Sequence, residues 1–292
     1  MVVKRGTIYE MKRSQIGFIL GLFCLTLVIW GLVFFFTYER GLTVAFLDIG
    51  QGDAIFIETP NKTQVLIDGG PNKSVLRQLG KVMPFYDRSI DMVVATHPDL
   101  DHIGGLPSVL DRFVIDSVVW SEASSDSSAY DAFFEKATNE QAKVLYARRG
   151  RLVLDVEHGV YLDILFPDRN VEGMEANASS IVTKLVYGDT SFLFMGDAPK
   201  SIEKYLVSID SDELNVDVLK LGHHGSKTST SEELLAYTTP QYAIISAGKD
   251  NRYGHPHEEV LELLGVFEVE YFNIADVGMI VFESDGKELK QK

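Results

Sequence analysis

The chain has 292 residues, of which 46% are hydrophobic and 11% aromatic, and a formal net charge of −15 at pH 7. This content is ample for a packed core, and the length allows one large domain or two small ones. The first 40 residues hold five basic and two acidic residues, so residues 41–292 hold 22 basic and 40 acidic ones, a net charge of −18. That charge excludes an electrostatic trap for nucleic acid, although metal ions can neutralise a site locally.

An apolar segment near the N-terminus predicts a membrane anchor. The stretch IGFILGLFCLTLVIWGLVFFF, residues 16–36, contains no charge, and as a helix it spans about 31 Å, enough to cross a bilayer core. Four basic residues precede it, and the one basic residue that follows is balanced by an acidic neighbour. The positive-inside tendency therefore predicts a cytoplasmic N-terminus. The residues concerned are Lys4, Arg5, Lys12 and Arg13 before the segment, and Glu39 and Arg40 after it.

Two other interpretations of the segment are weaker. A buried helix of a soluble protein is not expected to be apolar all round at a chain terminus. A cleaved signal peptide needs a small-x-small site, which FFFTYERG does not offer. We therefore expect residues 1–40 to be a cytoplasmic N-terminus and an uncleaved anchor, and residues 41–292 to form an extracellular domain. Cys24, the single cysteine, lies in the anchor, so the domain has no disulfide.

The first part of the domain is predicted to form a sheet with helices. Residues 41–70 predict three strands near 42–49, 53–58 and 63–67, because β-branched and apolar runs are interrupted by turn residues. A helix is predicted over 71–86, a buried strand over 90–96 and a helix from 105 to 113.

The second part repeats this alternation. Strands are predicted near 115–120, 143–146, 151–156 and 160–165, with a Ser-rich loop and helix over 121–141 between the first two. Residues 179–197 predict a hairpin with Gly188 and Asp189 in its turn. Helices near 199–207, 231–237 and 256–265 then alternate with strands near 216–221, 242–247, 268–273 and 278–283. These mixed runs predict two sheets between layers of helices in one domain.

The stretch HPDLDH, residues 97–102, places two histidines and two aspartates directly after a buried strand. Imidazole nitrogens and carboxylate oxygens are metal ligands, and on a tight turn they can divide between two ions. A polar loop with helix-capping aspartates is the alternative for this hexamer alone.

Two more apolar strands end in residues of the same type. FLFMGD delivers Asp197, and VLKLGHHGS delivers His223 and His224. Neighbouring strands bring such ends together at one edge of a sheet, so three of them in one chain favour a metal site over chance placement.

These motifs together resemble the metallo-β-lactamase superfamily, and in particular the hydrolase domain of the ComEC competence proteins. The resemblance covers about residues 44–283. It rests on FLDIGQGDA, VLIDGG, THPDLDHIGG, NASSIVTKL, FLFMGD, LKLGHHGSKTS and YGHPH. It implies an αββα sandwich, preceded here by one transmembrane helix, and a hydrolase with two divalent metal ions.

The resemblance also implies roles for individual residues. His97 and Asp99 resemble the ligands of the first ion, and Asp101 and His102 a pair at the second. Asp197 resembles the bridging carboxylate. His223 resembles the last ligand of the second ion, with His224 beside it as a neighbour or alternate ligand.

The chain departs from the wider superfamily in two ways. The pattern HxHxDH is HxDxDH here, and NASS, residues 177–180, replaces a histidine in the middle of the chain. The competence-type relatives share both changes. A first site richer in oxygen moves the expected ion from Zn²⁺ toward Mn²⁺ or mixed occupancy.

Several other residues are candidates for supporting roles. Asp68 is expected to accept a hydrogen bond from a ligand histidine, or else to form a turn. Asn177, Ser180 and Ser226 are candidates for phosphate contacts, although turn and capping roles fit the serines equally well. His255 in YGHPH is expected at the pocket mouth as a proton donor or a phosphate ligand, and Asp99 or Asp101 as the general base.

The expected function is therefore metal-dependent hydrolysis of a phosphodiester, most simply DNA, at the cell surface. The single anchor cannot form a channel, so a channel for uptake would be a separate partner protein.

One alternative is a cell-envelope phosphodiesterase acting on phosphorylcholine, teichoic acid or lipid head groups. A choline substrate would require an aromatic cage, for which the candidates are Tyr86, Trp120, Tyr130 and Tyr253. The other alternative is an anchored binding module without catalysis.

Overall fold

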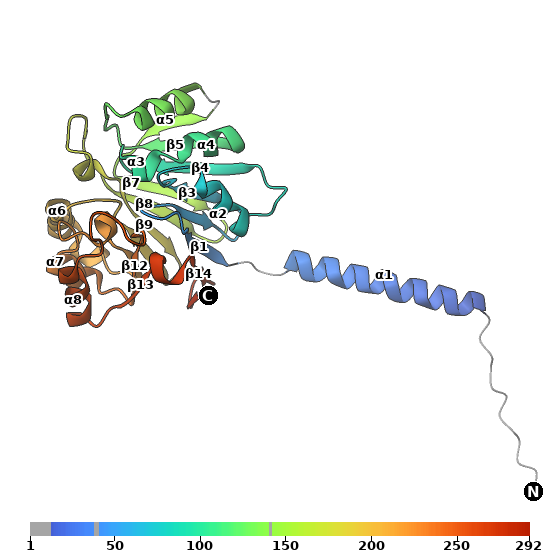
Figure 1. Ribbon diagram of the computed structural model, residues 1–292. Coiled ribbons are helices and arrows are strands. Elements are labelled where there is room, and N and C mark those ends of the chain that lie inside the picture. Colours follow the sequence, from blue (N-terminus) through green and yellow to red (C-terminus); the bar gives the residue numbers. More distant parts are fainter. Residues whose placement is uncertain (1–12, 38–40, 140–141) are drawn as a thin grey trace, which may run out of the picture. The chain divides into compact units, whose positions relative to one another are not determined.

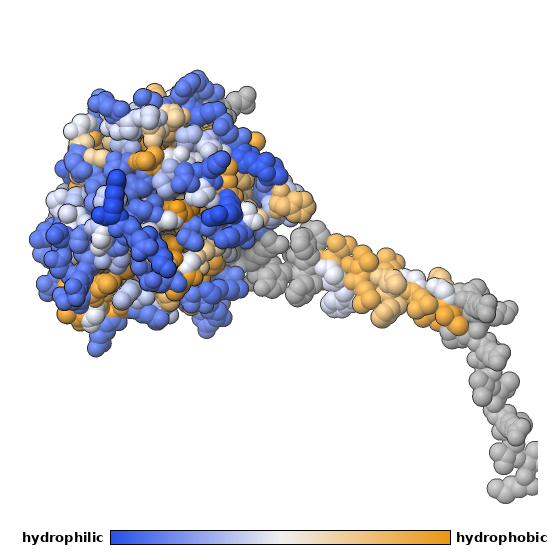
Figure 2. All heavy atoms as spheres, in the orientation of Figure 1, coloured by the Kyte–Doolittle hydropathy of each residue, from blue (hydrophilic) through white to orange (hydrophobic). Residues whose placement is uncertain are grey.

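The computed structural model describes residues 13–37, 41–139 and 142–292. These residues divide into an N-terminal helix and a compact unit that begins at Gly41. Helix α1 spans Arg13–Thr37, and its stretch Gln15–Val33 is long and apolar enough to cross a membrane. Side chains in this stretch are exposed, and Figure 2 shows them as a hydrophobic rod.

Some of the residues used in the predictions lie outside the described part of the chain. They are the charged residues Lys4, Arg5, Lys12, Glu39 and Arg40, together with residues 140–141 at the end of the Ser-rich segment. The cytoplasmic orientation of the N-terminus therefore stays a prediction.

Two sheets form the centre of the unit. The first has the strand order β15-β14-β1-β2-β3-β4-β5-β6. Its strands are β1 (Leu42–Phe46), β2 (Ile55–Glu58), β3 (Gln64–Ile67), β4 (Ser89–Ala95), β5 (Val114–Trp120), β6 (Lys143–Tyr146), β14 (Ile280–Ser284) and β15 (Leu289–Gln291). Strands β3 to β6 are parallel, so the loops that follow them share one edge.

The second sheet has the order β13-β12-β11-β10-β9-β8-β7. Its strands are β7 (Gly150–Asp155), β8 (Val160–Phe166), β9 (Val182–Tyr187), β10 (Thr190–Phe194), β11 (Val218–Lys220), β12 (Tyr242–Ile245) and β13 (Glu270–Asn273). Here β10 to β13 are parallel. The carboxyl ends of β10 and β11 therefore meet at one edge.

Helices cover the outer face of each sheet (Figure 1). The first layer contains α2 (Ser74–Val82), α3 (Leu100–Ile103), α4 (Leu106–Arg112) and α5 (Ser128–Asn139). The second contains α6 (Lys200–Asp210), α7 (Glu232–Thr238) and α8 (Glu258–Val266), and short helices are η1 (Asn177–Ser179), η2 (Ser211–Glu213), η3 (Gly222–Gly225) and α9 (Ile274–Val277).

Three apolar cores hold these layers together. Phe46, Ile57 and Phe194 belong to the core between the two sheets. A second core packs the first sheet against α2, α4 and α5, and a third packs the other sheet against α6 to α8. The predicted αββα sandwich is confirmed.

The Ser-rich segment belongs to the packed structure. Within it, α5 buries Phe133 and Ala137, and the Phe133 ring stacks on Trp120 at a centroid distance of 5.2 Å. Residues 128–139 therefore form part of the helical layer over the first sheet.

Candidate metal centre

The site forms where strands of both sheets end. Thr96 and His97 follow β4 of the first sheet, Asp197 follows β10, and His223 and His224 follow β11 of the second. The backbone ties these ends together, because the His223 N–H donates to the Gly196 carbonyl at 3.1 Å and the Ile181 N–H to the Thr96 carbonyl at 3.0 Å.

The Asp197 carboxylate lies at the middle of the site and is almost fully buried. Four imidazole nitrogens surround it. The Nε2 atom of His102 lies 3.2 Å from Oδ1. The Nε2 atoms of His224, His97 and His223 lie 3.4, 3.8 and 3.8 Å from Oδ2. One carboxylate thus faces every histidine of the two sequence motifs.

The two aspartates of HPDLDH contact different histidines of this cluster. Asp99 Oδ2 is 3.7 Å from His97 Nε2, and Asp101 Oδ2 is 3.4 Å from His224 Nε2. The structure therefore brings together all four polar residues of the hexamer with Asp197.

The adjacent histidines take positions different from those expected. His224 is buried within the cluster, whereas the His223 side chain is 27% exposed and its Nδ1 contacts the Thr228 hydroxyl at 3.0 Å. Both have left-handed backbone, with φ of 49° and 54°, which is uncommon outside glycine. Geometry thus favours His224 as the ligand beside Asp101 and His102, with His223 at the rim.

Residues behind the histidines fix how their rings are turned. Asp68 Oδ2 lies 2.7 Å from His102 Nδ1, and it also accepts the Thr96 hydroxyl hydrogen at 2.7 Å. Because Thr96 Oγ1 donates to Asp68, it is available to accept from His97 Nδ1, 3.0 Å away. His97 therefore presents its Nε2 lone pair to the centre, and His102 can do so once its Nε2 proton is released, the arrangement found behind metal-ligating histidines. This is the supporting role expected of Asp68.

His224 is held from behind by a buried ion pair. Asp53 Oδ1 lies 3.3 Å from His224 Nδ1, and Asp53 Oδ2 lies 2.8 Å from the ammonium of Lys220, which is fully buried. Burial opposes ionisation of Asp53, but the charge of Lys220 and then the contact with His224 outweigh it, so its pKa is lowered. One ligand-type atom each from Asp53, His102, Asp197 and His224 lies within 4.8 Å of the others. Since both Asp53 oxygens face other partners, Asp53 orients a ligand.

A glycine allows the loop that carries Asp53 to reach the ligand turn. Gly52 has φ +120°, and a Cβ there would lie 2.0 Å from the Asp101 carbonyl oxygen. The next residue, Asp53, donates its N–H to that same oxygen at 3.2 Å. The entry loop thereby locks the backbone of Asp101.

The cluster fits a divalent metal by two observations. His97 Nε2 is buried and has no hydrogen-bond partner among the described residues, which is costly unless something binds it. Imidazole and carboxylate groups together are the donor set of Zn²⁺ and Mn²⁺ sites. The residues present therefore fit the metal that the sequence predicts.

The protonation states follow from burial and charge. Burial lowers the pKa of His97 to about 3, so its lone pair is available. Burial also opposes protonation of His102 and His224, but the charge of Asp197 outweighs it and holds both pKa values well above the usual range. A metal ion must displace these protons, so binding releases them.

The remaining candidates take smaller roles. Ser180 Oγ accepts the Asp197 N–H at 3.1 Å and so holds the central residue, while Ser226 Oγ is engaged by Thr228 inside the turn. Asn177 lies in η1 with a buried Oδ1 that has no partner in the described structure.

His255 lies beside the two adjacent histidines. Its ring centroid is 5.3 Å from that of His223 and 6.3 Å from that of His224. Burial and the neighbouring histidines lower the pKa of His255 to about 4. The imidazole is therefore neutral near pH 7, and its role as proton donor or phosphate ligand stays a prediction.

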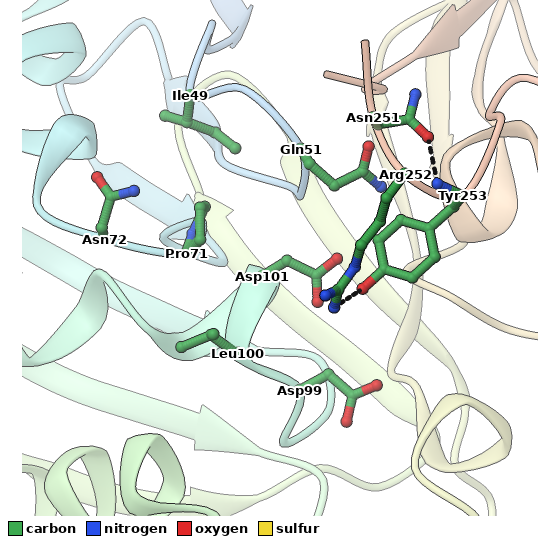
Figure 3. Close-up of a pocket in the computed structure, with 10 residues that line it drawn as sticks. All are labelled: Ile49, Gln51, Pro71, Asn72, Asp99, Leu100, Asp101, Asn251, Arg252 and Tyr253. Atoms are coloured by element: carbon green, nitrogen blue, oxygen red, sulfur yellow. Dashed lines mark hydrogen bonds between the residues drawn. The ribbon is translucent and has the colours of Figure 1, made fainter. Parts of the chain in front are cut away.

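A cavity of about 580 Å³ opens beside the aspartates (Figure 3). Asp99 and Asp101 form part of its wall, and Arg252 and Tyr253 lie on the opposite side. The predicted aromatic candidates do not assemble there: of the four, Tyr253 alone lines this cavity in the described structure. Trp120 packs against Tyr130 at 5.3 Å in the helical layer, and Tyr86 is exposed on the loop after α2.

Three residues beside the metal ligands or on the cavity wall were not predicted from the sequence, namely Thr96, Lys220 and Arg252. Lys220 carried a usable signal, because a lysine within the apolar run VLKL is rarely buried unless it is paired. Thr96 and Arg252 carried none that distinguishes them from ordinary loop residues.

Replacing Asp68 by Asn is expected to weaken metal binding by about 10- to 100-fold. The Asn amide would turn an NH₂ group toward donors that now share the carboxylate, namely Thr96 and His102 Nδ1. Calorimetric titration of the metal-stripped protein with Zn²⁺ measures the change. Asp116→Asn, on an exposed position of β5, is the control. Equal affinities for the Asp68 variant and the control would contradict this role.

Comparison with known proteins agrees with this architecture. Residues 47–249 match the family model of the metallo-β-lactamase superfamily. The chain is 33% identical over 238 residues to ComE operon protein 3 of Bacillus subtilis. This match covers 76% of this chain and 30% of that protein. It is 29% identical to Recombination protein 2 of Haemophilus influenzae, over 84% of this chain and 29% of that protein. It thus spans about three tenths of these curated relatives.

Solved structures show the same fold at low identity. YhfI, a metallo-β-lactamase fold protein from Bacillus subtilis, superposes with a TM-score of 0.55 at 11% identity, over 86% of this chain and all of that one. CmlA, a diiron β-hydroxylase from Streptomyces venezuelae, superposes with a TM-score of 0.54 at 12% identity, over 84% of this chain and 54% of that one.

Proposed function

Since this chain belongs to the metallo-β-lactamase superfamily, whose fold supports metal-dependent hydrolysis, we propose that it is a two-metal phosphodiesterase that acts on DNA. The observation that supports this most strongly is the sharing of Asp197. Four histidines contact its two oxygens, and Asp99 and Asp101 in turn contact His97 and His224.

This arrangement supports a division of the residues between two ions. His97 and Asp99 would hold the first ion and Asp101, His102 and His224 the second, with Asp197 between them. When bound, such ions neutralise the non-bridging oxygens of a phosphodiester and lower the pKa of an attacking water toward neutrality.

The protein's own groups would then orient the reactants. Asp99 and Asp101 line the cavity as well as the cluster, so either carboxylate can orient the water and accept its proton. Asp68 and Asp53 keep the histidine rings fixed from behind. His255, neutral near pH 7, is assigned no proton transfer and would contact the substrate from beside His223.

The competence relatives support DNA as the substrate. ComE operon protein 3 and Competence protein ComA of Neisseria gonorrhoeae, which is 30% identical over 76% of this chain, are related over the region that holds the site. We further propose that α1 anchors the chain in the cell membrane with the hydrolase unit outside, and that a separate channel protein is its partner in uptake. The apolar stretch of α1 supports the anchor.

The test is hydrolysis by the full chain in detergent, loaded with Mn²⁺ or Zn²⁺. Substrates are single-stranded DNA, double-stranded DNA and bis-p-nitrophenyl phosphate, and Asp101→Asn is the matched variant. We expect metal-dependent cleavage of DNA that falls by about 100-fold or more in the variant. Cleavage of the small diester alone would favour the cell-envelope phosphodiesterase. Metal binding without any cleavage would favour the binding module.

A further inference from the structure

Apart from the aspartates Asp99 and Asp101, which are assigned to the metal ions, the cavity wall offers hydrogen-bond donors. Gln51 Oε1 accepts the Gly248 N–H at 3.0 Å, which leaves Gln51 Nε2 buried and without a partner in the described structure. Asn72 Oδ1 accepts the Ser74 N–H at 2.9 Å, which turns its NH₂ group to the outside. Both amide orientations are fixed by backbone donors. These donors therefore favour a ligand with acceptor oxygens.

Arg252 adds a positive charge to these donors. Among the ten lining residues that the structure describes, it is the single cation, and no described carboxylate forms an ion pair with it. Its guanidinium donates to the Tyr253 hydroxyl at 2.7 Å and lies 4.9 Å from that ring's centroid. Figure 3 shows it extending over the cavity toward Asp101.

The loop that carries Arg252 is held in place. Asn251 Oδ1 accepts the N–H groups of Tyr253 and His255 at 3.1 and 3.0 Å. The same side chain donates through Nδ2 to the Gly248 carbonyl at 2.9 Å. Arg252 is thus presented from a braced turn next to the ligand aspartates.

This chemistry selects an anion over a choline group. A quaternary ammonium offers no acceptor, would be repelled by Arg252, and would find one aromatic ring here in place of a cage. A phosphate oxygen, in contrast, can accept from a guanidinium fork and from amide NH₂ groups at once.

We propose that this cavity is a subsite for the phosphate next to the one that is cleaved, with Arg252 as the residue that determines specificity. The inference rests on the proposed function and deepens it. The substrate class is an oligonucleotide with at least two consecutive phosphates, whose sugar or base lies against Ile49 and Leu100. The cavity volume is within the range of small-molecule sites. Arg252 thereby provides the local attraction that an acidic domain otherwise lacks.

The kinetic test compares a dinucleotide with one phosphate, TpT, and a trinucleotide with two, TpTpT. In the Mn²⁺-loaded full chain, Arg252→Gln is expected to lower kcat/KM for TpTpT about thirtyfold, and for TpT less than threefold. Arg252→Lys keeps the charge but loses the fork, so an intermediate loss is expected. The control is Arg151→Gln. Arg151 lies on β7, outside the cavity, and its guanidinium carbon is 3.6 Å from the centroid of the Tyr161 ring. This variant should leave both substrates unchanged. Equal losses on both substrates in Arg252→Gln, or none, would overturn the subsite.

A binding measurement separates failure of the subsite from failure of the proposed function. The probe is a fluorescein-labelled phosphorothioate (dT)₈, followed by anisotropy from 50 to 200 mM salt. Losing one phosphate contact should reduce the slope of log K against log salt by about 0.7 in Arg252→Gln. If the wild type cleaves nothing, the proposed function fails, and this slope still decides the subsite. An unchanged slope and affinity in Arg252→Gln would overturn it.

Discussion

Replacing Asp197 by Asn is expected to lower kcat for metal-dependent hydrolysis about a thousandfold. The carboxylate faces four imidazole nitrogens at 3.2 to 3.8 Å, more than any other carboxylate of the cluster in the described structure. An amide cannot bridge two cations as a carboxylate does, so charge stabilisation worth about 4 kcal/mol is lost. The measurement is kcat for single-stranded DNA at saturating Mn²⁺.

Two controls accompany this variant. Asp189→Asn changes an exposed aspartate in the turn before the same strand, β10, and should keep full activity. Circular dichroism and metal content show whether Asp197→Asn still folds and how many ions it retains. Activity within threefold of the wild type in a folded Asp197→Asn protein would rule out a bridging role.

Replacing Lys220 by Met is expected to lower the free energy of unfolding by about 3–5 kcal/mol. The ammonium and its partner Asp53 are both buried, 2.8 Å apart. Removing Lys220 leaves the buried Asp53 carboxylate with His224 alone to compensate its charge, which costs far more than the pair itself contributes. Urea unfolding of the metal-stripped protein measures the effect.

The double variant distinguishes the charge from the shape. In Asp53→Asn with Lys220→Met, no unpaired charge remains, so most of the stability should return. Activity should not return, because His224 Nδ1 has lost its carboxylate. Lys204→Met removes an exposed pair with Glu233 and should change stability by less than about 1 kcal/mol. A loss in Lys220→Met no larger than in Lys204→Met would show that the buried pair carries no such penalty.

The sandwich could be predicted because its strands are strongly patterned. Runs such as IDMVVA and FLFM are apolar on both faces, as strands between a second sheet and a helical layer must be. Strand β15 and helix α9 were not predicted. Leu289–Gln291 is short and polar and is formed by pairing with β14, and Ile274–Val277 is a single turn.

The ligand-type residues of the candidate site could be predicted because they follow apolar strands directly. The choice between His223 and His224 was not, since two adjacent left-handed residues decide which ring enters the cluster. The supports Thr96, Asp53 and Lys220 come from both sheets, and only their packing shows that they meet. Arg252 reaches the cavity through the fold of a loop that lies 151 residues after Asp101 in the sequence.

The central claim is that two metal ions on the Asp197 cluster hydrolyse a phosphodiester. The most direct measurement titrates the metal-stripped full chain with Mn²⁺ and follows cleavage of a single-stranded oligonucleotide at each addition. Activity should rise from background to a maximum at two ions per chain. A maximum at one ion per chain, or no cleavage at any metal content, would contradict it.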